Sequence, residues 1–160
     1  MRFYRRRAVL IAVSTAACVS AAAVYALISA TDDTVAVPVP DAHVAGYCRA
    51  LHAELPREVA GLPRHDLKPG SELTAGWGNP AIVLRCGVPR PAADGLVSTP
   101  AAEVGGVSWS FEEGAHGSVR LTTTLRKAYV ELTLPEKYAH DATPLADLAA
   151  AVKHTIPEGI

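Results

Sequence analysis

The chain has 160 residues, with 15 lysines and arginines against 16 aspartates and glutamates, and 49% of its residues are hydrophobic. This length predicts one domain with a short additional segment. All 16 acidic residues but only 11 of the basic ones lie in residues 31–160, which therefore carry a net charge of −5. A domain this acidic lacks the basic surface that a nucleic-acid backbone requires, so DNA and RNA are excluded as partners.

The N-terminal residues form a separate segment. Residues 8–30 are an uncharged run of 23 residues, which as a helix is long enough to cross the hydrocarbon core of a membrane. Arginines precede the run and aspartates follow it. By the positive-inside rule, we expect residues 1–7 to be a cytoplasmic basic segment and residues 8–30 a single-pass transmembrane signal anchor. The remaining residues are then extracytoplasmic, at the cell membrane.

Two other interpretations of this segment remain open. It can be a cleaved signal peptide that ends near Ala21-Ala22-Ala23. It can also be a lipoprotein signal that ends at Cys18, although the usual leucine before the cysteine is missing. Arg6-Arg7 also fits a loose twin-arginine pattern. Under the anchor, signal-peptide and lipoprotein interpretations alike, residues 31–160 lie outside the cytoplasm.

The cysteines predict a disulfide. Cys18 lies in the apolar segment, which leaves Cys48 and Cys86 as a pair in the outer domain. Outside the cytoplasm an even pair of cysteines is typical of a bridge. The alternative is a metal-binding or redox-active thiol pair, but the sequence has no C-x-x-C motif.

The first half of the outer domain predicts a helix followed by two strands. A proline-containing linker covers residues 31–40, and Asp41 is a suitable N-cap for the helix that follows. One stripe of that helix holds Val44, Cys48, Leu51 and Leu55, and Pro56 ends it. Residues 56–72 are expected to be a loop. Strands are expected at 73–77 and 81–88, the second with Ile82, Leu84, Cys86 and Val88 on one face and Val83 and Arg85 on the other.

The second half predicts three strands and a helix. After a loop at 89–103, strands are expected at 104–111, 118–125 and 128–134. A helix then begins at Thr143-Pro144 and runs to about Ile156. Strands joined by turns favour an antiparallel sheet. We therefore expect residues 41–157 to be one α+β domain, with a sheet of about four to five strands covered on one face by two helices.

No motif for catalysis, a cofactor or a metal is recognisable. The six histidines lack metal-binding spacing, and Ser108 lies in a sequence that misses the nucleophile-elbow motif by its last residue. Trp77 and Arg85 are the candidates to face a ligand, because they offer an aromatic ring and a guanidinium in one segment. The alternative is that Trp77 fills the core and Arg85 lies on the solvent face of the sheet.

Several short motifs resemble one family of proteins. Residues 45–157 resemble the actinobacterial domain of unknown function 3515 family. The matching segments are Tyr47–Leu51, Trp77–Pro80, Ile82–Val88, Val107–Trp109, Ala128–Leu132 and Tyr138. The resemblance implies secreted, lipid-linked or membrane-anchored envelope proteins, in which Cys48 and Cys86 match family cysteines that pair. It brings no activity, cofactor or catalytic residue.

The sequence therefore favours a membrane-anchored extracytoplasmic protein whose domain binds or supports another cell-envelope component without catalysis. Its expected partners are the membrane, through residues 8–30, and an envelope protein or the cell wall. The alternative is an enzyme that acts on cell-wall material through an unrecognised site. A deep cleft lined by Arg85 and carboxylates would favour the enzyme, and a flat polar face with exposed aromatic side chains would favour the binding domain.

Overall fold

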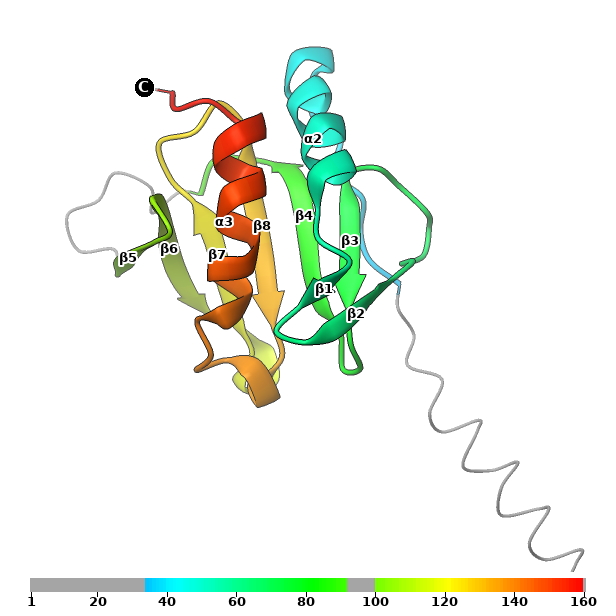
Figure 1. The fold of residues 1–160 in the computed structure, drawn as a ribbon, viewed down its shortest axis with the longest axis vertical. Coiled ribbons are helices and arrows are strands. Elements are labelled where there is room, and N and C mark those ends of the chain that lie inside the picture. The colour runs from blue at the N-terminus through cyan, green and yellow to red at the C-terminus, as the bar shows by residue number, and fades with distance from the viewer. Residues whose placement is uncertain (1–33, 92–99, 160) are drawn as a thin grey trace, which may run out of the picture. The chain divides into compact units, whose positions relative to one another are not determined.

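In residues 34–91 and 100–159, which this computed structural model describes, eight strands form one antiparallel sheet. Their spatial order is β1-β2-β3-β4-β8-β7-β6-β5 (Figure 1). Only β4 and β8 are neighbours that lie far apart in the sequence. The strands are β1 (Glu58–Val59), β2 (Leu62–His65), β3 (Thr74–Trp77), β4 (Ile82–Val88), β5 (Ala101–Val104), β6 (Val107–Glu113), β7 (Val119–Thr123) and β8 (Tyr129–Leu134).

The expectation of four to five strands is wrong, because the sheet has eight. Two of the additional strands, β1 and β2, lie in residues 56–72, which were expected to be a loop. The third, β5, forms a hairpin with β6 through Gly105-Gly106, whose φ angles are +61° and +78°. β1 and β5 are the edge strands and β2 lies next to β1. Short strands of this kind have little hydrophobic periodicity of their own, since pairing with a neighbour stabilises them.

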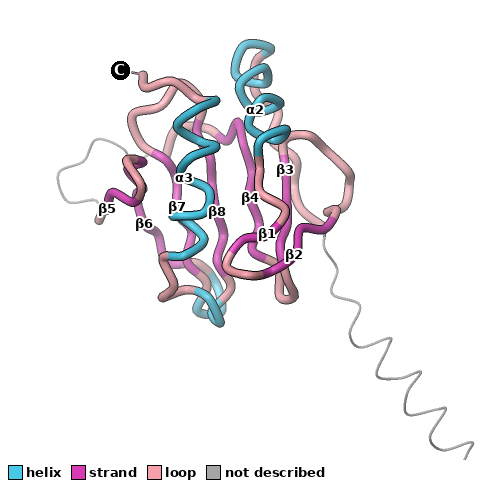
Figure 2. Tube along the Cα trace, in the orientation of Figure 1, coloured by secondary structure: helices cyan, strands magenta, loops and turns pink. Residues whose placement is uncertain are grey.

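Two helices lie side by side on one face of the sheet (Figure 2). They are α2 (Ala42–Glu54) and α3 (Thr143–Thr155), and two short 3₁₀ helices, η1 (Ala115–Gly117) and η2 (Glu136–Tyr138), follow β6 and β8. Asp41 is the N-cap of α2: its Oδ1 accepts hydrogen bonds of 2.9 Å from the N–H groups of His43 and Val44. The predicted cap is therefore confirmed.

The predicted transmembrane segment, residues 8–30, lies outside the described residues, as does the cytoplasmic segment 1–7. Among the residues that are described, no helix is both long and apolar enough to cross a membrane. The described chain begins with Thr34, which forms a bridge with Lys68, and the N–H of Val35 donates to the Lys68 carbonyl at 2.8 Å. This contact joins the chain N-terminal to α2 to the loop between β2 and β3.

The core lies between the helices and the sheet. Ile82, Leu84 and Cys86 of β4 are buried on the helix-facing side, while Val83 and Arg85 lie on the opposite side and are partly exposed. The predicted alternation of β4 is thus confirmed from Ile82 to Cys86. It is wrong for Val88, because the strand register shifts between Cys86 and Val88, and Val88 lines a pocket on the same side as Arg85. The core also contains the largest fully buried side chains, which include Trp77, Trp109, Leu51, Leu132 and Leu148.

The predicted disulfide is present. Cys48 of α2 and Cys86 of β4 are bonded, with their Cα atoms 5.5 Å apart, and both residues are 1% exposed. The bond joins the first helix to the centre of the sheet, because β4 is a middle strand. It encloses a chain segment that includes β1, β2 and β3.

A histidine and an arginine meet at the C-terminal end of α2. Arg64 of β2 lies with its Nη2 atom 2.7 Å from His52 Nε2, and its Nη1 donates to the His52 carbonyl at 3.4 Å. Burial lowers the pKa of His52 and the positive charge of Arg64 lowers it further, against smaller opposing contributions from Glu72 and Asp66. Burial also lowers the pKa of Arg64. The contact therefore favours neutral His52 as acceptor of the Arg64 N–H.

This contact predicts a pH dependence of stability. The pKa of His52 is lower in the folded state than in the unfolded chain. Neutral His52 therefore stabilises the fold fully above the unfolded pKa of about 6.5, and this stabilisation is lost as the pH falls from that value through the folded pKa. We expect the melting temperature of the native chain to fall more steeply between pH 7.5 and 5 than that of His52→Gln, whose amide can accept from Arg64 at every pH. Equal slopes for the two proteins would contradict the assignment.

Candidate functional site

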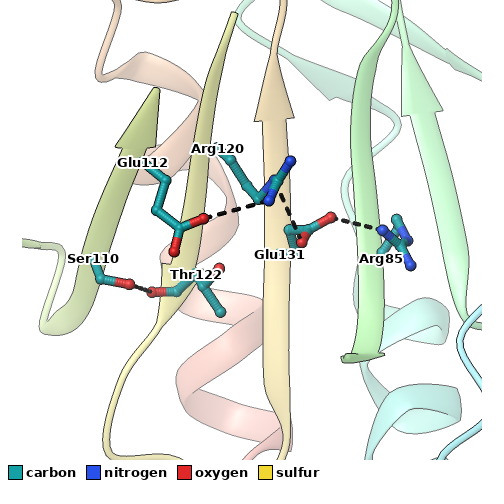
Figure 3. A network of polar contacts seen from close by, with 6 residues as sticks. All are labelled: Arg85, Ser110, Glu112, Arg120, Thr122 and Glu131. Carbon is teal, nitrogen blue, oxygen red and sulfur yellow. Dashed lines mark hydrogen bonds and ion pairs between the residues drawn. The ribbon is translucent and has the colours of Figure 1, made fainter. Parts of the chain in front are cut away.

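The face of the sheet opposite α2 and α3 carries a row of charged side chains. It crosses four adjacent strands, β4, β8, β7 and β6, with alternating sign (Figure 3). In spatial order the four residues are Arg85, Glu131, Arg120 and Glu112. Two of the contacts join directly opposed residues, since Arg85 is paired with Glu131 and Glu112 with Arg120 in the strand register. Cross-strand pairs of opposite charge stabilise a sheet by a few tenths of a kcal/mol to about 1 kcal/mol.

Glu131 is the central carboxylate of this charged row. Its Oε1 atom lies 3.0 Å from Arg85 Nη1, and its Oε2 atom lies 3.8 Å from Arg120 Nε. Arg120 also contacts Glu112, with 3.3 Å between Nη1 and Oε2. The side chain of Glu131 is only 12% exposed, against 47% for Arg120 and 44% for Glu112. The row therefore has a shielded centre and a solvent-accessible end at β6 and β7.

Two small polar residues lie beside the charged row. Ser110 of β6 and Thr122 of β7 are directly opposed, and the Ser110 hydroxyl donates to the Thr122 carbonyl at 3.2 Å. They are 3% and 6% exposed. A buried hydroxyl needs a hydrogen-bond partner, and for Ser110 the neighbouring strand supplies one.

A pocket of about 190 Å³ opens over the charged row. Its polar wall contains the four charged residues and Thr122, and its apolar wall consists of Val88, Pro89 and Pro91. Sites that enclose a drug-sized molecule usually measure about 300–1,000 Å³. This pocket is therefore sized for one side chain or one sugar unit of a larger partner. Within the described residues, no group of three or more His, Cys, Asp or Glu side chains is placed to hold a metal ion.

The structure separates the two residues that were predicted to face a ligand. Arg85 lines the pocket with its side chain 28% exposed, and its Nε atom is buried without a hydrogen-bond partner among the described residues. Trp77 is 0% exposed and lies on the helix-facing side, where its Nε1 donates to the Pro56 carbonyl at 3.2 Å. Because successive strand residues point to opposite faces, Arg85 shares a face with Thr74 rather than with Trp77.

Sequence reasoning did not find Arg120, Glu131 or Glu112 as parts of a site. A signal was nevertheless present, because Arg120 and Glu131 occupy polar positions in two predicted strands whose other face is apolar. Glu112 and its neighbour Glu113 point to opposite faces, so only Glu112 joins the charged row. What the alternation does not supply is the strand order, which sets β8 between β4 and β7.

The comparisons with known proteins identify the family. The model of the family described as "Protein of unknown function (DUF3515)" matches residues 8–160. The chain belongs to this family. The match is longer than residues 45–157, on which the resemblance rested, and it includes the apolar segment 8–30. No curated protein and no solved structure matches the chain.

Proposed function

We propose that this protein is a non-enzymatic binding domain of the actinobacterial cell envelope that attaches to another envelope component through the open face of its sheet. The observation that carries the proposal is the charged row over β4, β8, β7 and β6, with its small pocket. Two guanidiniums and two carboxylates of alternating sign suit a partner that carries both hydrogen-bond donors and acceptors, such as a peptide or a glycan.

Binding is favoured over catalysis because the carboxylates are already engaged. The pocket does bring Arg85 together with two carboxylates, the combination that favours an enzyme. However, both oxygens of Glu131 face arginine nitrogens, and Glu112 contacts Arg120. A glycosidase needs one carboxyl that gives a proton and a second that faces it across the scissile bond. Here a guanidinium occupies the space between the two carboxylates.

The proposed location rests on the sequence and on the disulfide. Residues 8–30 have the length and flanking charges of a single-pass anchor, which supports a location of the domain outside the cytoplasm at the cell membrane. Disulfides persist in that compartment, and the domain contains one in its core. The membrane is thus one partner of the protein, and an envelope protein or the cell wall is the other.

The proposal is tested by photo-crosslinking in intact cells. A photo-reactive amino acid at Thr133, which is directly opposite Arg120 on the open face, is expected to capture an envelope component. The same probe at Ala150, an exposed position of α3, is the matched control on the helix side. Capture at Ala150 alone would contradict the proposal, as would turnover of cell-wall material by the purified protein.

Replacing one exposed arginine of the charged row is expected to weaken the crosslink. Arg120→Gln removes the contacts to Glu112 and Glu131, so we expect the yield at Thr133 to fall about tenfold, the effect of losing one charge-assisted contact. Arg49→Gln removes the same charge from an exposed position of α2 and is expected to leave the yield unchanged. Equal yields in both variants would show that the partner does not bind the charged row.

A further inference from the structure

A second pocket lies at the end of the sheet where β8 begins and the C-terminal residues return. Its volume is about 730 Å³, larger than the pocket of the open face and within the range of ligand sites. The residues that line it include Arg90, Arg126, Lys127, His43 and Glu158. The cations of Arg126 and Lys127 therefore lie beside one carboxylate, that of Glu158, in a domain whose net charge is −5. This local excess of positive charge favours an anion.

Arg126 gives the pocket a buried positive charge. Its side chain is 5% exposed, and it donates to two carbonyl oxygens, those of Ile156 at 2.7 Å and Gly106 at 3.2 Å. These two carbonyls accept hydrogen bonds from the guanidinium but do not neutralise its charge. The carboxylate of Glu158 is 3.9 Å from Nη2 and 85% exposed, so it compensates that charge weakly. An anion in the pocket would lower the cost of keeping this guanidinium buried.

The loop that carries these residues is held by the C-terminal segment. The N–H of Lys127 donates to the Pro157 carbonyl at 3.0 Å, and the N–H of Gly159 donates to the Leu125 carbonyl at 2.9 Å. The backbones of Arg126 and Glu158 form an isolated antiparallel β-bridge between the two segments. The Lys127 backbone is therefore fixed at the pocket before any ligand arrives, which reduces the entropy lost on binding.

Leu125 adds an apolar group to the same pocket. It is 62% exposed, and its φ of +56° is unfavourable for a side chain of this kind. Strained backbone persists where the surrounding structure holds it, and such positions gather at binding sites. Tyr129 also lines the pocket. An apolar and an aromatic side chain beside the cations suit an anion that carries a carbon skeleton.

From these features we infer that this pocket binds a phosphate ester. The phosphate contacts Lys127 over the buried charge of Arg126, and the organic part contacts Leu125 and Tyr129. The N-terminus of α2 lies nearby at His43, but Asp41 already accepts its first N–H groups, so the cationic side chains provide the binding. The inferred site is independent of the charged row on the open face.

The inference is tested by calorimetric titration of the full-length protein in neutral-detergent micelles with glycerol 1-phosphate and with inorganic phosphate. Glycerol 1-phosphate is expected to bind, and Lys127→Gln to weaken it about tenfold, since a charged hydrogen bond contributes about 1.5–3 kcal/mol. Lys137→Gln in η2, which removes the same charge beside Tyr138, is the matched control and is expected to bind as the native chain does.

A second titration with phosphatidylglycerol in the micelles identifies the source of the phosphate. If a lipid headgroup occupies the pocket, the added lipid competes and glycerol 1-phosphate binding disappears. If the ligand is a free phosphate ester, the affinity is the same with and without the lipid. Absence of glycerol 1-phosphate binding without the lipid would overturn the inference. An equal loss of affinity for glycerol 1-phosphate in the Lys127→Gln and Lys137→Gln variants would also overturn it. Thermal unfolding of each variant verifies that it is folded.

Discussion

Replacing Cys48 and Cys86 together with serine is expected to lower the free energy of unfolding by about 4 kcal/mol. The bond joins residues 38 positions apart, so removing it frees a long loop in the unfolded chain, and the stabilisation by a crosslink grows with the length of that loop. Typical domains are stable by only about 5–15 kcal/mol. The loss is therefore a large part of the total.

Denaturant unfolding of the oxidised native chain, the reduced native chain and the double variant measures this effect. The reduced chain is the control for the two serine hydroxyls, which the variant places in a buried position. We expect both altered proteins to unfold at a lower denaturant concentration than the oxidised chain. Cys18→Ser is expected to leave the midpoint unchanged. If reduction does not move the midpoint, the crosslink contributes nothing to stability and the expectation is wrong.

Replacing Trp77 with alanine is expected to cost about 3–5 kcal/mol, the usual range for removing a buried aromatic side chain. Trp77 is fully buried between the sheet and the helices, and its indole N–H satisfies the Pro56 carbonyl. The variant leaves a cavity and removes a donor from that carbonyl. A residue that faced a ligand from the surface would be replaced at little cost to stability.

Chemical denaturation of Trp77→Ala and Trp77→Phe separates the two contributions. Phenylalanine restores most of the buried volume but not the hydrogen bond, so we expect it to be destabilised by only about 1–2 kcal/mol. Arg85→Gln serves as the comparison, because Arg85 is the other residue predicted to face a ligand and is partly exposed on the open face. A Trp77→Ala protein as stable as the native chain would contradict the placement of this side chain in the core.

Elements with strong periodicity were predictable from the sequence. The stripe of α2, the N-cap Asp41 and the alternation of β4 as far as Cys86 were all recognisable from local patterns. The bulge after Cys86, which carries Val88 to the open face, was not. The edge strands were not recognised. β1 has two residues and β5 is exposed at three of its four positions, so neither carries a burial pattern that a sequence can display. The Gly105-Gly106 turn was the one local signal of the β5–β6 hairpin.

Of the two residues predicted to face a ligand, Arg85 lies at the candidate site and Trp77 does not. Arg85 reaches the open face because it alternates with the buried residues of β4. Trp77 was paired with it on the basis of nearness in the sequence, but the register places the two on opposite faces. The other members of the charged row come from strands 27 to 46 positions away in the chain, so only sheet order brings them together.

By itself, the sequence determined the charge of the domain, the apolar segment at residues 8–30, the disulfide pair and the family, because composition and local spacing carry these features. The tertiary structure alone decided the eight-stranded order and the two pockets. The physical reason is that both depend on contacts between distant segments. β8 pairs with β4, and Pro157 and Gly159 pair with the loop that holds Arg126 and Lys127. No pattern within either segment specifies its partner.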